Sequence, residues 1–186
     1  WDGVYYSERL IFLVEEETSQ YDLEFYTCNS STLDSVFEVS TIYGIGPLLF
    51  NEVLFNTEDD CPEFVELYND SNEYIKVDSL YLGYASSGDF ADDIYQFPAG
   101  LIIPPYSYVV LCEDLKQLKS FYDVNRSCVL VEMNMPNLLN DEGVLFLINE
   151  NGEVLTKSSY NENEHNEFLE DEEGVSLERI NLESDR

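Results

Sequence analysis

Carboxylates are the most frequent side chains in this sequence that could bind or transform another molecule. The chain contains 39 aspartate and glutamate residues and 8 lysine and arginine residues, which gives a formal net charge of −31. Carboxylate oxygens are the hard ligands that calcium prefers, and no other cofactor is indicated. The candidate calcium ligands lie in three acidic stretches: Asp59, Asp60, Asp89, Asp92, Asp93, Glu170 and Asp171. None of these stretches has the spacing of an EF-hand loop, so a solvated acidic surface is the alternative.

Catalysis by a nucleophile and a base finds little support in the residue types. His165 is the single histidine, and it lies within an acidic segment, residues 161–173. The sequence contains no GxSxG, HExxH or P-loop pattern. We therefore predict that the chain is not an enzyme.

The four cysteines, Cys28, Cys61, Cys112 and Cys128, form no CxxC pair, so the spacing of a zinc site is absent. In an oxidising compartment they could form two disulfides. The shortest closure joins Cys112 to Cys128, which leaves Cys28 to pair with Cys61. Buried free thiols are the alternative.

The strongly negative charge limits the classes of partner. A chain this acidic repels phosphate backbones, which excludes general binding to DNA or RNA, and it disfavours anionic membrane surfaces. No apolar run approaches the roughly 18 residues that a membrane span needs. The remaining partners are cations, basic proteins and neutral molecules such as glycans, although core packing explains the many aromatic residues better than a glycan platform does.

These side chains must be positioned mainly by β-strands, because the dominant period of the apolar residues is two. Turn residues separate nearly all of the short β-branched and aromatic runs, a pattern typical of an all-β sandwich or barrel. Asn151-Gly152 predicts a hairpin with a type I′ turn. One helix is predicted over residues 113–122, with acidic residues in its first turn. The predicted strands cover residues 10–14, 21–27, 35–40, 48–55, 64–68, 74–77, 80–84, 94–97, 108–111, 128–132, 144–148, 154–160 and 175–180.

A domain boundary is predicted near Gly44-Ile45-Gly46-Pro47, where glycine and proline interrupt the strand pattern. Residues 1–46 hold too few strands for an independent sandwich. We expect them to be the closing strands of a preceding, truncated immunoglobulin-like neighbour, with an extra β layer on the main domain as the alternative. The main domain is expected over residues 47–182, and residues 183–186 form the C-terminal end. Because the chain begins at Trp1 without a basic and apolar leader, we expect it to be a processed or excised piece.

Five motifs in order resemble the lamin tail domain family. They are LLFNEVLFN (residues 48–56), EFVELYNDS (63–71), FPAG with the following IP and YVVL (97–111), PNLLN with the following G and VLFL (136–147), and GVSLERI (174–180). The resemblance is to the bacterial branch of the family, found in secreted and surface proteins of Bacteroidota. It implies an immunoglobulin-like β-sandwich, which agrees with the independent strand pattern.

The strand Phe64-Val65-Glu66-Leu67-Tyr68 places a glutamate between apolar neighbours. Alternate side chains of a strand point to opposite faces, so Phe64, Glu66 and Tyr68 share one face. Arg179 is the candidate partner of Glu66 or Glu52, in a bidentate ion pair that fixes the sandwich. A ligand-binding role for these acids is the alternative.

The resemblance implies a non-catalytic structural, adhesion or protein-interaction module of an exported bacterial protein. The expected location is secreted or at the cell surface, outside the outer membrane, with a protein partner in an envelope assembly. Two other functions are considered: an accessory domain that targets a linked exported enzyme, and an adhesion module stabilised by calcium.

Overall fold

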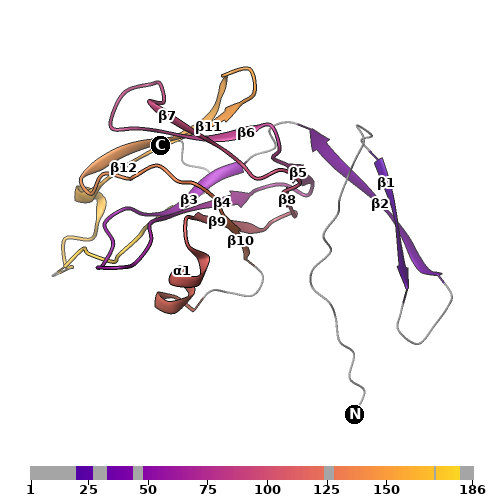
Figure 1. The fold of residues 1–186 in the computed structure, drawn as a ribbon, viewed down its shortest axis with the longest axis horizontal. Helices are drawn as coiled ribbons and strands as arrows, with labels where there is room; N and C mark the ends of the chain where they lie inside the picture. The colour runs from indigo at the N-terminus through magenta and orange to yellow at the C-terminus, as the bar shows by residue number, and fades with distance from the viewer. Residues whose placement is uncertain (1–19, 27–32, 44–47, 124–127, 170, 181–186) are drawn as a thin grey trace, which may run out of the picture.

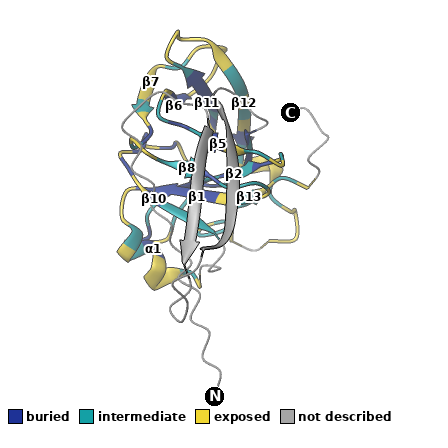
Figure 2. Ribbon diagram, turned by 90° about the vertical axis from the view of Figure 1, so that its right-hand side faces the viewer, coloured by how far each residue is buried: buried dark blue, intermediate teal, exposed yellow. Residues whose placement is uncertain are grey.

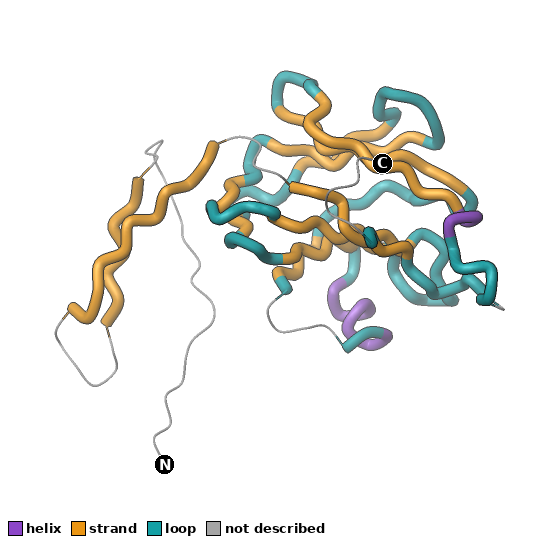
Figure 3. The backbone as a smooth tube through the Cα atoms, turned by 180° about the vertical axis from the view of Figure 1, so that it is seen from behind, coloured by secondary structure: helices purple, strands orange, loops and turns teal. Residues whose placement is uncertain are grey.

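The computed structural model describes residues 20–26, 33–43, 48–123, 128–169 and 171–180, and these residues form a β-sandwich with one short helix (Figure 1). The immunoglobulin-like sandwich predicted from the strand pattern and the motifs is therefore confirmed. Figure 3 shows the strands joined by loops and turns, with the helices limited to short segments. The predicted strand at residues 10–14 lies outside the described residues.

Two sheets form the layers of the sandwich. The five-stranded sheet has the order β10 (Val129–Glu132), β9 (Tyr108–Cys112), β4 (Phe64–Asn69), β3 (Leu48–Leu54) and β13 (Leu177–Glu178). The four-stranded sheet has the order β12 (Val154–Asn161), β11 (Glu142–Asn149), β6 (Leu80–Ala85) and β7 (Asp93–Gln96). Within each sheet the pairs are antiparallel except β10 with β9, which is parallel.

The main core lies between these sheets, where the strands are dark blue in Figure 2. From the five-stranded sheet, Val65 and Leu67 point inward and are fully buried. Leu82 and Leu147 meet them from the four-stranded sheet. The alternation predicted for β4 is thus confirmed, and it leaves Glu66 on the outer face of its sheet.

A third sheet joins β1 (Gln20–Tyr26), β2 (Leu33–Tyr43), β5 (Tyr74–Lys76) and β8 (Ile102–Ile103) in that order. Strands β1 and β2 form an antiparallel hairpin, and the end of β2 pairs in parallel with β5. Figure 1 shows this hairpin beside the sandwich. Whether residues 1–46 belong to a separate domain stays a prediction.

The helix α1 (Leu115–Phe121) begins two residues later than predicted, and its first turn holds no acidic residue, because Asp114 serves as its N-cap. The side chain of Asp114 accepts a hydrogen bond from the Gln117 amide at 2.8 Å. Leu118 is buried beneath the helix, and Tyr122 packs against the same small cluster. The short 3₁₀ helix η1 (Glu162–Glu164) follows β12 and was not predicted.

The Asn151-Gly152 hairpin is confirmed, but its turn differs from the predicted type. A type I′ turn needs positive φ at both central residues, whereas only Gly152 of this pair has it, at 80°. The Gly152 amide donates to the Asn149 carbonyl at 3.0 Å, and the Asn149 amide donates to the Glu153 carbonyl at 3.0 Å. These bonds close a three-residue loop with a glycine bulge, which has the same sequence preference.

The Asn-Asp-Ser end of the EFVELYNDS motif has a structural explanation. Asn69 is completely buried, and its amide nitrogen donates to the carbonyls of Glu73 and Pro104, each at 2.8 Å. Its side-chain oxygen accepts from the hydroxyl and amide of Ser71. One side chain therefore ties the β4–β5 turn to the segment before β9, as a buried amide must be fully paired.

Candidate functional site

Among the described residues, α1 covers one end of the outer face of the five-stranded sheet. At that end, three residues lie side by side on neighbouring strands and pack against Leu118 of the helix: Leu54, Phe64 and Cys112. The rest of this face extends beyond the helix and carries charged and aromatic side chains. Because half-buried or exposed side chains are available to other molecules, we treat this part of the sheet as the candidate site.

A row of three glutamates crosses this part of the face. The register sets Glu178 of β13 opposite Glu52 of β3, and Glu52 opposite Glu66 of β4. Directly opposite residues of antiparallel strands have Cβ atoms roughly 4.5–5.5 Å apart, and like charges in such pairs are destabilising. The row continues with apolar residues, Val110 of β9 and Leu130 of β10.

A β-bulge in β3 produces this row. The register shifts between Phe50 and Glu52, so Asn51 is the extra residue and Glu52 turns to the outer face. The amide nitrogen of Asn51 donates to the Glu66 carboxylate at 2.8 Å. The bulge therefore places a glutamate beside Glu66 and provides a donor for it.

Burial and the charges of neighbouring glutamates raise the pKa values of Glu52 and Glu66. The pKa of Glu66 is raised to about 7, mainly by desolvation; the hydrogen bond from Asn51 opposes this increase, and the neighbouring charges of Glu52 and Glu178 add to it. Desolvation also raises the pKa of Glu52, and Glu178 adds to that increase, while the hydroxyl of Ser176, which donates to its carboxylate, opposes it. A cation placed beside Glu52 and Glu66 would lower these pKa values and so favour the release of a proton.

Two tyrosines lie beside the glutamate row, on the side away from the helix and two residues farther along β4 and β9. Tyr68 of β4 and Tyr108 of β9 are opposite each other, and their ring centroids are 4.7 Å apart. Tyr108 is 42% exposed. We call Glu52, Glu66, Glu178, Tyr68 and Tyr108 the Glu–Tyr face; it combines aromatic area with negative charge.

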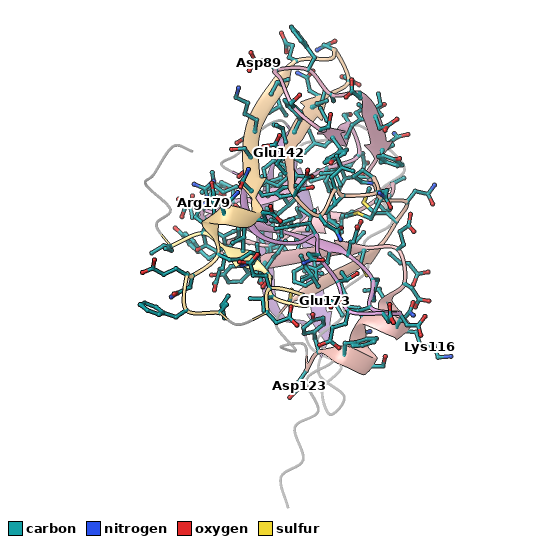
Figure 4. The ribbon with its side chains drawn as sticks, turned by 90° about the vertical axis from the view of Figure 1, so that its left-hand side faces the viewer. Asp89, Lys116, Asp123, Glu142, Glu173 and Arg179 are labelled. Atoms are coloured by element: carbon teal, nitrogen blue, oxygen red, sulfur yellow. The ribbon has the colours of Figure 1, made fainter. Side chains whose placement is uncertain are left out.

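The contacts described for Arg179 are to the backbone of β3, and its predicted ion pair with Glu66 or Glu52 stays a prediction. Arg179 follows Glu178 in the chain, so its side chain points to the opposite face of the strand. Its Nε donates to the Phe50 carbonyl at 2.9 Å, and its main-chain amide donates to the Asn51 carbonyl at 2.7 Å. Arg179 also lines a cavity of about 360 Å³ between β3, β12 and β13, and Figure 4 shows it projecting at that side of the sandwich.

The model of the lamin tail domain matches residues 43–162, well over half of the chain. This chain belongs to the lamin tail domain family. The match contains the bulge of β3 and the whole of β4, β9 and β11. No curated protein matches the chain. The family is immunoglobulin-like and not typically catalytic, so the family-level prediction from the five motifs is confirmed.

The outer face of the four-stranded sheet in this lamin tail domain is covered by its own chain. Residues 86–92, the loop between β6 and β7, fold over a small cluster that contains buried Phe146 and Ile148. Lys157 of β12 forms an ion pair with Asp89 of this loop, with its Nζ 2.6 Å from the aspartate Oδ1. Gly83 permits this close approach, because a Cβ there would lie 2.8 Å from the Cβ of Ala91.

The candidate calcium ligands of the domain are dispersed. Asp89 pairs with Lys157, which lowers its pKa, and Asp171 accepts a hydrogen bond from the Glu173 amide at 3.1 Å. Asp59, Asp60, Asp92 and Asp93 are exposed, and Glu170 lies outside the described residues. In the described part of the chain, no three His, Cys, Asp or Glu side chains gather where they could hold a metal ion. Calcium binding stays a prediction, which thermal unfolding in chelator and then in calcium can check.

The predicted disulfide between Cys112 and Cys128 is not formed. Among the described residues, Cys61, Cys112 and Cys128 are free thiols, and Cys28 lies outside these residues. The parallel register sets Glu132, not Cys128, opposite Cys112. Burial raises the pKa values of Cys112 and Cys128 to about 11, so neither thiol is an activated nucleophile at neutral pH.

His165 does not assemble a catalytic arrangement within the described residues. Its ring packs on Phe55, with centroids 5.7 Å apart, and its Nε2 is buried without a hydrogen-bond partner in that part of the chain. The described helices also lack the length and apolar character that crossing a membrane would require.

Sequence reasoning found Glu52 and Glu66 but missed Glu178 and Tyr108 as their neighbours. The GVSLERI motif contained the signal, since a glutamate next to the arginine must point to the opposite face of the strand. Tyr108 could be placed only after the pairing of β9 with β4 was known.

Proposed function

We propose that this lamin tail domain is a non-catalytic protein-interaction module of an exported bacterial protein, positioned at the cell surface or in an envelope complex. The observation that carries the proposal is the Glu–Tyr face beside α1, whose five residues are half-buried or exposed. The partner contacts this face with a segment that carries lysine or arginine.

The arrangement of charges supports a cationic partner. Three glutamates side by side destabilise the free domain, because like charges on opposite residues repel one another; this repulsion contributes to the raised pKa values of Glu52 and Glu66. A guanidinium or ammonium group placed over the row would relieve this repulsion and donate charge-assisted hydrogen bonds to the carboxylates. The long-range attraction of a chain with a net charge of −31 favours the same kind of partner.

The aromatic part of the face supports a protein partner over a free ion. Tyr68 and Tyr108 provide rigid area on which an arginine can stack or an apolar side chain can pack. Aromatic residues next to charged groups are typical of interface centres and their rims.

Photo-cross-linking in the source cells tests this proposal with the full-length parent protein. A benzoylphenylalanine replaces Tyr108 in one strain and Phe168, which is 85% exposed and lies outside the Glu–Tyr face, in another. We expect one dominant protein adduct from position 108 that is absent from position 168.

The variant Glu52→Gln with Glu66→Gln, combined with the label at position 108, serves as the charge control. The adduct should be lost in this variant while the domain stays folded. The same adducts from positions 108 and 168, or an adduct that persists without the two charges, would contradict the proposal.

A further inference from the structure

The strand β7 forms an open edge of the four-stranded sheet. It pairs with β6 on one side, and no described strand pairs with its other side. The Phe97 amide donates to the Leu80 carbonyl at 3.1 Å, and Tyr95 lies opposite Leu82. Because hydrogen-bonded and non-hydrogen-bonded pairs alternate, the backbone N–H and C=O of Ile94 and Gln96 point away from β6.

Apolar side chains are exposed at this open edge. Ile94 is 58% exposed on β7, and Phe90 is 83% exposed in the loop that leads into the strand. Ile94 shares the outer face of its sheet with the buried cluster of Phe146 and Ile148, since it lies opposite Gly83. An open edge with exposed apolar residues is a surface that proteins usually block, so its presence indicates use.

Two exposed carboxylates mark one end of the same edge. Asp92 and Asp93 lie at the start of β7, and both are exposed. If two copies of this chain paired through β7, these aspartates and the high net charge of each copy would oppose the contact. The same charges attract a strand that carries basic residues.

We infer that the open edge of β7 accepts an extended strand from a partner protein, with lysine or arginine beside Asp92 and Asp93 and an apolar residue beside Ile94 and Phe90. The incoming backbone bonds to the outward N–H and C=O groups of Ile94 and Gln96. Main-chain bonds of this kind provide affinity, and the side chains on alternate positions provide specificity. The edge belongs to the sheet opposite the Glu–Tyr face, so the inference stands independently of the proposed function.

Amide hydrogen exchange, followed by nuclear magnetic resonance, tests strand addition at single residues. The probe is a soluble eight-residue peptide that alternates valine with lysine. At about ten times its dissociation constant, we expect it to slow exchange of the Ile94 and Gln96 amides about tenfold. Exchange of the Tyr95 amide, which points toward β6, should stay unchanged.

Two controls separate strand addition from attraction by charge alone. A twin peptide with glutamate in place of lysine should give no protection. The variant Gln96→Pro removes an outward N–H and retains the bonds to β6, so it should fold normally and lose most of the protection. The variant Ile94→Lys repeats the test if proline disturbs the strand.

Three results would overturn the inference. Unchanged exchange at both amides would show that β7 does not accept a strand. Shifts confined to Tyr68, Tyr108 and the glutamate row would place binding on the Glu–Tyr face instead. Protection that grows with protein concentration before peptide is added would identify a second copy as the occupant.

Discussion

The two outer faces of the sandwich differ in what covers them. On the four-stranded sheet, the loop of residues 86–92 closes over Phe146 and is held by Asp89 and Lys157. On the five-stranded sheet, α1 covers one end, and the residues of the Glu–Tyr face beyond it are half-buried or exposed. In Figure 4, Asp89 lies at the opposite end of the molecule from Lys116 in α1.

This difference shows which surface the fold needs for its own stability. Apolar residues that the chain covers itself contribute to folding, whereas neighbouring like charges work against it. A face that carries such charges beside exposed aromatic rings is therefore better explained by contact with another molecule. The predictions below test this contrast, beginning with the largest expected effect.

Truncating one aromatic residue on each face should separate the faces most clearly. Phe146→Ala removes a fully buried ring from the covered face and should lower the free energy of unfolding by about 3–5 kcal/mol. Tyr108→Ala removes a 42% exposed ring from the open face and should lower it by less than about 1 kcal/mol. Urea unfolding monitored by fluorescence measures both. Equal losses would mean that the open face is part of the folding core.

Adding one methyl group should disturb the covered face. Gly83→Ala would place a Cβ 2.8 Å from Ala91 and from Ile148, so the 86–92 loop must shift. We expect a loss of about 1–3 kcal/mol in the free energy of unfolding. The double variant with Ala91→Gly relieves one of the two contacts and should recover part of the loss. A Gly83→Ala protein as stable as the parent would show that the loop does not pack there.

The pH dependence of stability should reveal the open face. Glu66 has a folded pKa of about 7 and a reference value of 4.5, so its protonated form favours the folded state. Its contribution is present below pH 4.5 and is lost as the pH rises through 7. Burial also raises the pKa of Glu63 to about 7. The Leu138 amide donates a hydrogen bond to the Glu63 carboxylate at 3.0 Å. The domain should therefore be more stable at pH 5 than at pH 8.

Single variants assign this pH dependence to a face. Glu66→Gln should raise the free energy of unfolding at pH 8 by an amount on the order of 1 kcal/mol, reduced by the partial exposure of the group. It should also flatten the stability curve between pH 5 and pH 8. Glu150→Gln in the exposed β11–β12 hairpin removes the same charge and serves as the control. Denaturant unfolding across this pH range gives the comparison. If Glu66→Gln leaves the pH dependence of stability unchanged, the glutamate row does not cause it.

Breaking the surface ion pair should have the smallest effect. Asp89→Asn removes the partner of Lys157, but both side chains are mostly exposed, so global unfolding should hardly change. The effect should be local: the Asp92 amide, which donates to the Tyr84 carbonyl at 2.8 Å, should exchange faster. Ser87→Ala in the same loop is the control. Unchanged exchange would show that the loop does not depend on this pair.

Much of the fold was predictable from the sequence, because strand periodicity and turn residues act locally. The strands β3, β4, β6, β9 and β11 lie where the alternating runs predicted them. The two-residue strand β8 is too short for its period to be recognised. The turn after Asn149 shows a similar limit, since Asn-Gly fits more than one loop conformation.

The candidate site was predictable only in part, because it depends on register between distant strands. Alternation in β4 correctly placed Glu66 and Tyr68 on one face. The bulge at Asn51 changes the face of the sheet to which the following β3 residues point, and no local sequence pattern indicated this bulge. The choice of Arg179 as the partner of Glu66 or Glu52 did not take into account the preceding residue, Glu178, which lies opposite Glu52. The cysteine pairing failed because it rested on chain distance and not on register.

The most direct test of the account is whether cation binding on the Glu–Tyr face displaces a proton from Glu66. The probe is a short peptide that alternates arginine with serine, titrated calorimetrically into the domain at pH 7 in phosphate and then in Tris. A guanidinium over the row lowers the pKa of Glu66, so binding should release a proton, and the measured heat should differ between the two buffers. Glu66→Gln should abolish that difference. The same heat in both buffers, or no binding at all, would contradict the claim that this face is built for a basic partner.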